Sequence, residues 1–212
     1  MRVLLPSLDT VGRLQGGRTQ GELTVPASQS EQELLGGHDP LAFSREWTTA
    51  HPRVDPRTKE LILFRSTFVS PYVRYSVLAA DAQIRDTPSM VNVPIPGITC
   101  AKMMHDLGVS PTHTTILDLP LFLAPQNLLR NMSAVSYDDR SLSRFGVFPR
   151  HDPSQIRWFQ SDGCCTLHTA NAWDSQDAVH LPACRPTSAS FVFSAAGLLR
   201  CTINTYFYII TF

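Results

Sequence analysis

Three histidines, His51, His105 and His168, each lie in or beside a strand-like run of this 212-residue chain. They are 54 and 63 residues apart, which is close to the repeat of about 40–50 residues that one blade of a β-propeller occupies. Histidines from successive blades can converge on the propeller axis, where neutral imidazoles bind Fe, Zn, Cu or Ni. The spacing therefore indicates a metal site with three imidazole ligands. A fourth histidine would complete the set, and the sequence offers no obvious candidate for it.

The remaining four histidines carry a weaker signal. They lie in turns or at polar strand ends, where we expect exposed side chains without a metal: His38, His113, His151 and His180. Three histidines with an open position would also suit a zinc hydrolase. That alternative is disfavoured, because no glutamate lies at the short helical spacing that such an enzyme uses for its general base.

The numbers of basic and acidic residues bear on which kinds of molecule the chain is expected to bind. Lys plus Arg and Asp plus Glu each total 18, so the formal net charge is zero and no nucleic acid partner is expected. Charged residues make up 17% of the chain, below the roughly 25% of ordinary globular proteins, which predicts modest solubility. No run approaches the ~20 apolar residues of a membrane-spanning helix.

The five cysteines match no zinc-binding pattern, and their number is odd. Cys164 and Cys165 are adjacent and therefore too close for an ordinary disulfide. The first residues lack the apolar segment of a secretory signal. These features together indicate a reducing compartment, and we expect a cytoplasmic protein.

Short strands between turn signals dominate the chain from Trp47 onward. In the first of them, Trp47, Thr49 and His51 are predicted to share one face. In residues 72–77 the apolar side chains alternate with polar ones, which predicts a half-buried strand, and residues 110–113 have the chemistry of a hairpin turn. Further strands are predicted at residues 60–64, 103–109, 114–119, 144–148, 156–159, 164–172, 178–184 and 191–193, with a turn at Asp81 and a loop at 94–97.

No stretch of twelve or more residues shows helical periodicity, and the chain has 16 prolines. The predicted fold class is therefore all-β, an array of sheets. Residues 1–34 are expected to be a poorly ordered lead-in and residues 35–199 the structured domain. Residues 200–212 end in an aromatic, β-branched and uncharged run, which predicts either a strand or an exposed, aggregation-prone tail.

Five motifs in register resemble the carotenoid cleavage oxygenases. The first histidine lies in TAHPRVDPRTKEL at residues 49–61, the second in MMHD at 103–106, and the third in LHTANAWD at 167–174. TILDLP at 115–120 belongs, together with MMHD, to the second motif. RFGVFPR at 144–150 is similar to the loop that follows it in the family, and ACR at 183–185 recurs after the third histidine motif. The resemblance covers residues from about 35 to 199.

The resemblance implies a seven-bladed β-propeller, of which this chain would form about three to four blades. It also implies an Fe(II) ion held by four histidines, with His51, His105 and His168 as three of them. Asp106 and Asp118 are expected to be hydrogen-bonding residues rather than ligands. The family adds dioxygen across a conjugated alkene, which lies in an apolar tunnel, and releases two carbonyl products. The expected partners are thus an apolar alkene and dioxygen, with peripheral membrane contact open.

The chain also departs from the family. It is shorter than family members, the blade before the first histidine is largely absent, and the fourth histidine is missing. We therefore expect a truncated gene product, and a catalytically inactive fragment is the alternative to an active dioxygenase. Lys59 stands where the family usually has glycine, and because lysine disfavours positive φ, the turn is expected to differ.

The substrate class stays open at the level of sequence. Residues 182–190 (PACRPTSAS) resemble stilbene-cleaving members of the family from fungi. A carotenoid substrate would require a longer apolar tunnel, whereas a stilbene would require polar groups for its phenol hydroxyls. The residues that would line either tunnel are not identified by these motifs.

Overall fold

The computed structural model describes residues 46–79, 90–124, 127, 135–186 and 203–211, together with four two-residue strands before residue 24. The predicted turn at Asp81, the predicted strand at 191–193, and most of residues 1–34 lie outside this part. The chain divides into two compact units, Met1–Pro94 and Ile95–Phe212. Within the described residues no helix is both long and apolar enough to cross a membrane.

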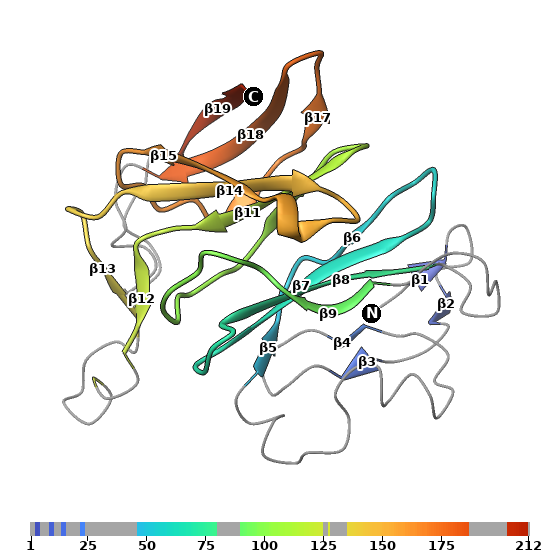
Figure 1. Ribbon diagram of the computed structural model, residues 1–212, viewed down its shortest axis with the longest axis horizontal. Helices are drawn as coiled ribbons and strands as arrows, with labels where there is room; N and C mark the ends of the chain where they lie inside the picture. Colours follow the sequence, from blue (N-terminus) through green and yellow to red (C-terminus); the bar gives the residue numbers. More distant parts are fainter. Residues whose placement is uncertain are drawn as a thin grey trace. The chain divides into compact units, whose positions relative to one another are not determined.

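The first unit contains one antiparallel sheet of five strands (Figure 1). The strand order is β5, β7, β8, β9, and β6 pairs with the other part of β7. Two short pairs, β1 with β2 and β3 with β4, precede this sheet. The bounds are β1 Val3–Leu4, β2 Asp9–Thr10, β3 Leu14–Gln15, β4 Glu22–Leu23, β5 Glu46–Thr48, β6 Arg53–Val54, β7 Leu61–Thr67, β8 Val73–Leu78 and β9 Met90–Pro94.

The predicted alternation of β8 is confirmed for its apolar side chains, since Val73, Tyr75 and Val77 are all buried. Ser76 on the opposite face is buried as well, and its hydroxyl accepts a hydrogen bond from the backbone N–H of Asn92 at 2.9 Å. The neighbouring β7 is buried along six consecutive residues, Arg65 and Ser66 included, so neither of its faces is exposed over that length.

The second unit contains two four-stranded antiparallel sheets and one separate strand pair (Figure 1). The first sheet has the order β10, β11, β14, β15. In the second, β18 pairs with β16, β17 and β19, and the separate pair is β12 with β13. The bounds are β10 Leu107–Val109, β11 His113–Asp118, β12 Leu121–Leu123, β13 Val135–Tyr137, β14 Ser143–Pro149, β15 Arg157–Ser161, β16 His168–Thr169, β17 Trp173–Asp174, β18 Ala178–Pro186 and β19 Ile203–Thr211.

The hairpin predicted at residues 110–113 is confirmed, because β10 and β11 pair from Val109 with Thr114 to Leu107 with Ile116. Its first strand begins at Leu107 rather than at residue 103. The continuous strand predicted at 164–172 is wrong. Only β16 forms there, because Cys164 turns its backbone N–H to the hydroxyl of Ser143, at 2.9 Å, instead of a neighbouring strand.

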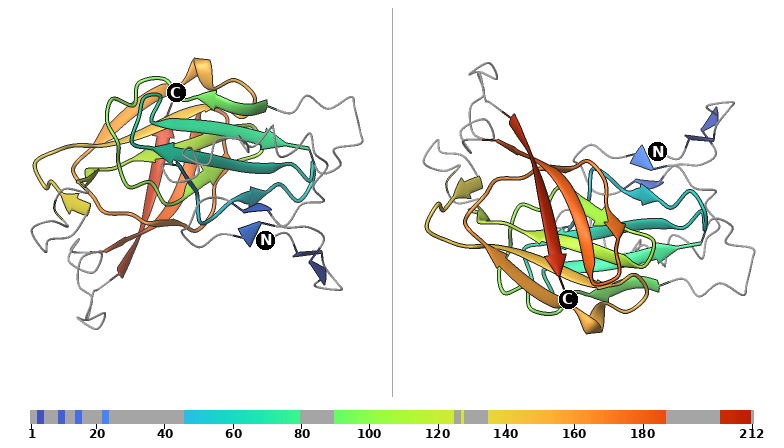
Figure 2. Two further views of the ribbon diagram at one scale, coloured as in Figure 1. Left: turned by 90° about the horizontal axis from the view of Figure 1, so that it is seen from below. Right: turned by 90° about the horizontal axis from the view of Figure 1, so that it is seen from above.

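The last strand, β19, pairs with β18 along nine residues, and the two run side by side in Figure 2. Of the two alternatives for residues 200–212, a strand is thus the correct one. Ile210 is 5% exposed and belongs to the main apolar cluster of the unit, against which Tyr208 also packs. Its neighbour Ile209 is 61% exposed, as expected for alternate side chains of a strand.

The predicted all-β class is confirmed. The described part of the chain consists of strands and loops, with short 3₁₀ segments such as η2 (Pro153–Gln155) and no α-helix. The largest sheets in this part of the chain are one of five strands and two of four strands.

Candidate metal site

His105 and His168 meet in the second unit, although they are 63 residues apart in sequence. His105 lies two residues before β10, and His168 is the first residue of β16. Their Nε2 atoms are 3.2 Å apart, and the ring planes are inclined at 68°. His168 is exposed and His105 half-buried.

The separation between these two nitrogens fits two ligands of one metal ion. Imidazole nitrogens lie about 2.0–2.1 Å from a bound metal such as zinc, so neighbouring ligands in octahedral or tetrahedral geometry are about 2.8–3.4 Å apart. The observed 3.2 Å falls within this interval. A direct hydrogen bond between the two rings would give a similar distance.

A buried carboxylate links the segments that hold these two histidines. Asp106, which follows His105, is 3% exposed. Its Oδ2 accepts hydrogen bonds from the backbone N–H of Thr169 at 2.8 Å and from the Thr169 hydroxyl at 2.9 Å. Its Oδ1 accepts from the N–H of Leu107 at 2.8 Å. The prediction that Asp106 is a hydrogen-bonding residue is confirmed.

Asp118, the last residue of β11, has the same kind of role. It is 1% exposed, and Lys102 Nζ lies 2.7 Å from its Oδ1. Arg144, which stands opposite it on β14, donates from Nε to Oδ2 at 2.8 Å and also from its terminal nitrogen. Two cations therefore neutralise this buried carboxylate, and the prediction of a strand-end hydrogen-bonding residue is confirmed.

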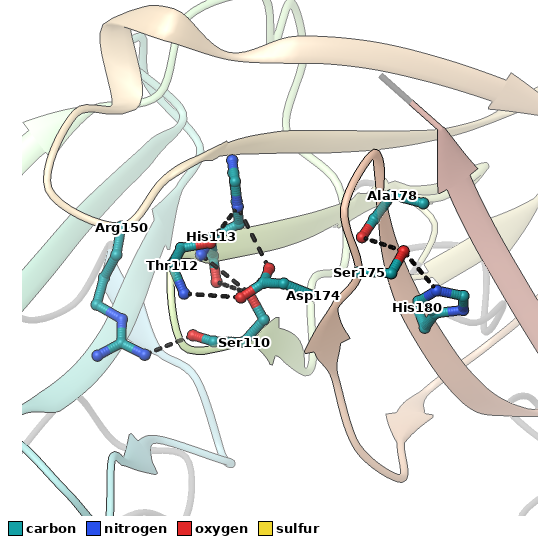
Figure 3. A network of polar contacts seen from close by, with 8 residues as sticks. All are labelled: Ser110, Thr112, His113, Arg150, Asp174, Ser175, Ala178 and His180. Atoms are coloured by element: carbon teal, nitrogen blue, oxygen red, sulfur yellow. Dashed lines mark hydrogen bonds and ion pairs between the residues drawn. The ribbon is translucent and has the colours of Figure 1, made fainter.

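A third carboxylate, Asp174 on β17, holds the β10–β11 hairpin by hydrogen bonds (Figure 3). It accepts hydrogen bonds from the Ser110 hydroxyl at 2.6 Å and from the Thr112 backbone N–H at 3.0 Å, and His113 Nδ1 lies 3.3 Å away. Partial burial acts to raise the pKa of Asp174, but the hydrogen bonds from Ser110, Thr112 and His113 outweigh it, so the pKa is lowered. The chain segments after His105 and after His168 are thus joined at two places.

The structure places His51 in the first unit, in a bend three residues after β5 ends. The prediction that it shares a strand face with Trp47 and Thr49 is wrong. Thr49 still donates its N–H to the carbonyl of Phe64 at 3.0 Å, but its hydroxyl accepts the N–H of His51 at 3.2 Å. This local side-chain bond replaces the strand ladder and ends the strand.

The turn after His51 is built around Asp55, which is 6% exposed. Its Oδ1 accepts the backbone N–H groups of Arg57 at 2.8 Å and Thr58 at 3.3 Å, and its carbonyl accepts that of Lys59 at 2.8 Å. Lys59 has a φ of +61°. The expectation that lysine avoids positive φ here is wrong, because the hydrogen bonds to Asp55 impose the turn on whichever residue occupies position 59.

The other histidines have structural partners. His113 Nδ1 lies 3.3 Å from Asp174 Oδ1 and 2.7 Å from the Thr112 hydroxyl. His180, which is half-buried, stacks on the Trp173 ring. Its Nε2 lies 3.0 Å from the Ser175 hydroxyl (Figure 3). The prediction of exposure is correct for His151 and wrong for these two. His38 lies outside the described residues.

Comparisons with known proteins settle the family. The model of the family described as RPE65, retinal pigment epithelial membrane protein, matches residues 1–200. The chain belongs to this family. It is the family that the motif resemblance indicates, the carotenoid cleavage oxygenases.

Curated relatives of the family align with the chain over part of their length. The carotenoid dioxygenase carX of Gibberella fujikuroi is 46% identical over 95% of this chain and 30% of its own length. The carotenoid 9,10(9′,10′)-cleavage dioxygenase 1 of Pisum sativum is 37% identical over 65% of this chain and 25% of its own. The chain therefore spans about a quarter to a third of the relatives that it matches.

Solved structures establish the fold. The lignostilbene dioxygenase of Pseudomonas brassicacearum superposes with a TM-score of 0.61 at 20% identity, over 78% of this chain and 35% of that one. The monoclinic D477G ACO/RPE65 chimera superposes with a TM-score of 0.64 at 16% identity, over 90% and 40%. Carotenoid oxygenases are seven-bladed β-propellers, so this chain is part of such a propeller. The prediction of a partial propeller is confirmed.

Proposed function

We propose that the chain contributes His51, His105 and His168 as ligands to the Fe(II) site of a dioxygenase that cleaves a conjugated alkene. The observation that supports this most strongly is the 3.2 Å separation of His105 Nε2 and His168 Nε2. It is the spacing expected of two imidazoles on one metal ion. His51 is included because its motif at residues 49–61 matches the first histidine motif of the family.

The donor set fits iron. All three residues are histidines, and imidazole binds Fe as well as Zn, Cu and Ni. Membership of the family supports the choice of iron among these metals. When bound, the Fe(II) ion would activate dioxygen, whose two atoms would enter the two carbonyl products. The chain's own contribution is to hold His105 and His168 side by side, which the hydrogen bonds around Asp106 and Asp174 support.

We propose a carotenoid or apocarotenoid as the substrate, rather than a stilbene. The relatives that are 46% and 37% identical are both carotenoid dioxygenases by name. The lignostilbene enzyme is similar in fold at only 20% identity. A cytoplasmic location with peripheral contact to a membrane, where carotenoids dissolve, belongs to the same proposal.

Product analysis tests this function. The purified chain would be loaded with Fe(II), incubated with an apocarotenal and ¹⁸O₂, and analysed by mass spectrometry for the two cleavage carbonyls. The proposal expects labelled aldehydes from the chain and none from His105→Ala. Cleavage that persists in His105→Ala would overturn the assigned ligand.

The alternative hypothesis is that the 212-residue chain is by itself a catalytically inactive fragment, because the fourth histidine of the family's iron site has no match in its sequence. Iron binding without any aldehyde product would favour this alternative. It would leave the three ligands in place and remove only the catalytic part of the proposal.

A further inference from the structure

The His105 and His168 segments belong to different sheets, so no strand ladder fixes the distance between them. His105 precedes β10 of the first sheet of the second unit, whereas His168 opens β16 of the second sheet. The close contact of their rings, with centroids 5.0 Å apart, therefore needs another source of order. Side-chain hydrogen bonds between the two segments are the available one.

Asp106 and Thr169 provide these hydrogen bonds, and each directly follows one of the two histidines. The Thr169 hydroxyl lies 2.9 Å from Asp106 Oδ2 and 3.1 Å from the Leu107 carbonyl, and the Thr169 N–H points to the same carboxylate oxygen. Asp106 and Thr169 are 3% and 6% exposed, whereas the histidines beside them are half-buried and exposed. The hydrogen-bonded pair of Asp106 and Thr169 is thus more deeply buried than the two histidines that are proposed to bind the metal.

From this arrangement we infer that Asp106 and Thr169 are positioning residues, which set the spacing of the His105 and His168 imidazoles and so the affinity of the site for a metal. The inference rests on the proposed function, since it assigns a role toward the proposed iron site. A carboxylate that accepts three hydrogen bonds in a buried position is a strong and directional link. Groups that orient metal ligands in this way commonly change metal affinity about 10–100-fold when removed.

The test compares Co²⁺ affinity, followed by the visible absorption of the bound ion, among variants of Asp106 and Thr169. Thr169→Val removes the hydroxyl but keeps the backbone hydrogen bond, and we expect about a tenfold weaker affinity. Asp106→Ala is expected to weaken it about 10–100-fold. Thr169→Ser restores the hydroxyl and should bind within about twofold of the unchanged protein, which a loss of bulk packing alone would not produce.

Two control variants separate positioning from stability. Thr115→Val removes a hydroxyl that is buried in β11 and has no hydrogen-bond partner among the described residues. Ser143→Ala removes a hydroxyl that is fully buried and bonded to the Cys164 N–H. Both should leave Co²⁺ affinity unchanged, and Ser143→Ala should lower the melting temperature as Thr169→Val does. Equal loss of affinity in Ser143→Ala and Thr169→Val would overturn the inference.

A measurement without metal distinguishes this inference from the proposed function. In the metal-free protein, the nuclear Overhauser effect between the His105 and His168 ring protons should be present, and it should be lost in Asp106→Ala and weakened in Thr169→Val. Failure of the unchanged protein to bind Co²⁺ would remove the proposed iron site alone. Persistence of the ring contact in Asp106→Ala would overturn the positioning role alone.

Discussion

At the scale of single residues, the turn after His51 shows how a side chain can impose a backbone conformation. Asp55 accepts two backbone N–H groups and places Lys59 at φ +61°. The sequence identifies this position, because related proteins usually have glycine there. It does not show that the turn persists with lysine, since that depends on the hydrogen bonds to a buried carboxylate.

The first prediction follows from this strain. Lys59→Gly should stabilise the chain by about 1 kcal/mol, because a non-glycine residue in the left-handed region costs about 1–2 kcal/mol and glycine loses part of that gain in the unfolded state. The free energy of unfolding in urea measures it. Asn92→Gly, at φ +54°, is the control and should gain little, since asparagine tolerates this region. A destabilised Lys59→Gly would show that no strain is present.

A second prediction concerns Asp174 and acid. Its pKa is lowered in the folded chain, because the hydrogen bonds from Ser110, Thr112 and His113 outweigh the effect of burial. Its contribution to stability is therefore present above the ordinary aspartate pKa of about 3.9 and is lost as the pH falls through the lowered value. Urea unfolding across this acidic range should show a smaller loss of stability for Asp174→Asn than for the unchanged chain. An identical pH dependence in both would contradict the assignment.

The hydrogen-bonding roles of Asp106 and Asp118 could be predicted, because both stand in family motifs beside structural turns or strand ends. The partners of these residues could not. Thr169 is 63 residues from Asp106, and Asp174 is 64 residues from Ser110. Such pairs arise from the packing of one sheet on the next and leave no local pattern in the sequence.

At the scale of elements, local periodicity identified strands best where one face is polar. The prediction for residues 60–64 found β7 but ended three residues too early, because Arg65 and Ser66 look like loop residues and are in fact buried. The strands β9, β12 and β13 were not predicted. They are short or end at a proline, and strands of three residues carry too little alternation to be recognised.

Burial of β19 leads to a third prediction. Ile210 is 5% exposed within the apolar cluster of the second unit, so Ile210→Ala should reduce the free energy of unfolding by about 2–4 kcal/mol. Ile209→Ala on the same strand is the matched control. Ile209 is 61% exposed, and its change should stay within about 0.5 kcal/mol. Equal small effects would show that β19 is not part of the core.

Tyr208 gives an independent readout of the same strand. Burial is the largest cause that raises the pKa of its phenol to about 12. The neutral phenol therefore stabilises the fold below the ordinary value of about 10, and this stability is lost as the pH rises toward 12. Ultraviolet titration should show tyrosine absorbance that changes late, and Tyr208→Phe should reduce this late change by the amount of one tyrosine, leaving the smaller contribution of Tyr137, whose pKa burial also raises. A Tyr208 that titrates near 10 would place β19 away from the cluster.

At the scale of the whole molecule, the all-β class and the partial propeller could be predicted, the class from strand-like runs and the propeller from the order of five motifs. The separation of His105 and His168 could not be, because it depends on how two sheets of the second unit pack. The assignment of His51 as a third ligand rests on its motif and stays a prediction.

Iron stoichiometry tests the central claim most directly. The purified chain would be dialysed anaerobically against Fe(II) and then analysed by mass spectrometry for bound iron. We expect about one iron per chain, as a site with several imidazole ligands implies, and a large loss in His51→Ala, His105→Ala and His168→Ala. His151→Ala, at an exposed histidine, should retain full binding. Iron near zero in the unchanged chain, or binding that none of the three substitutions reduces, would contradict the proposed site.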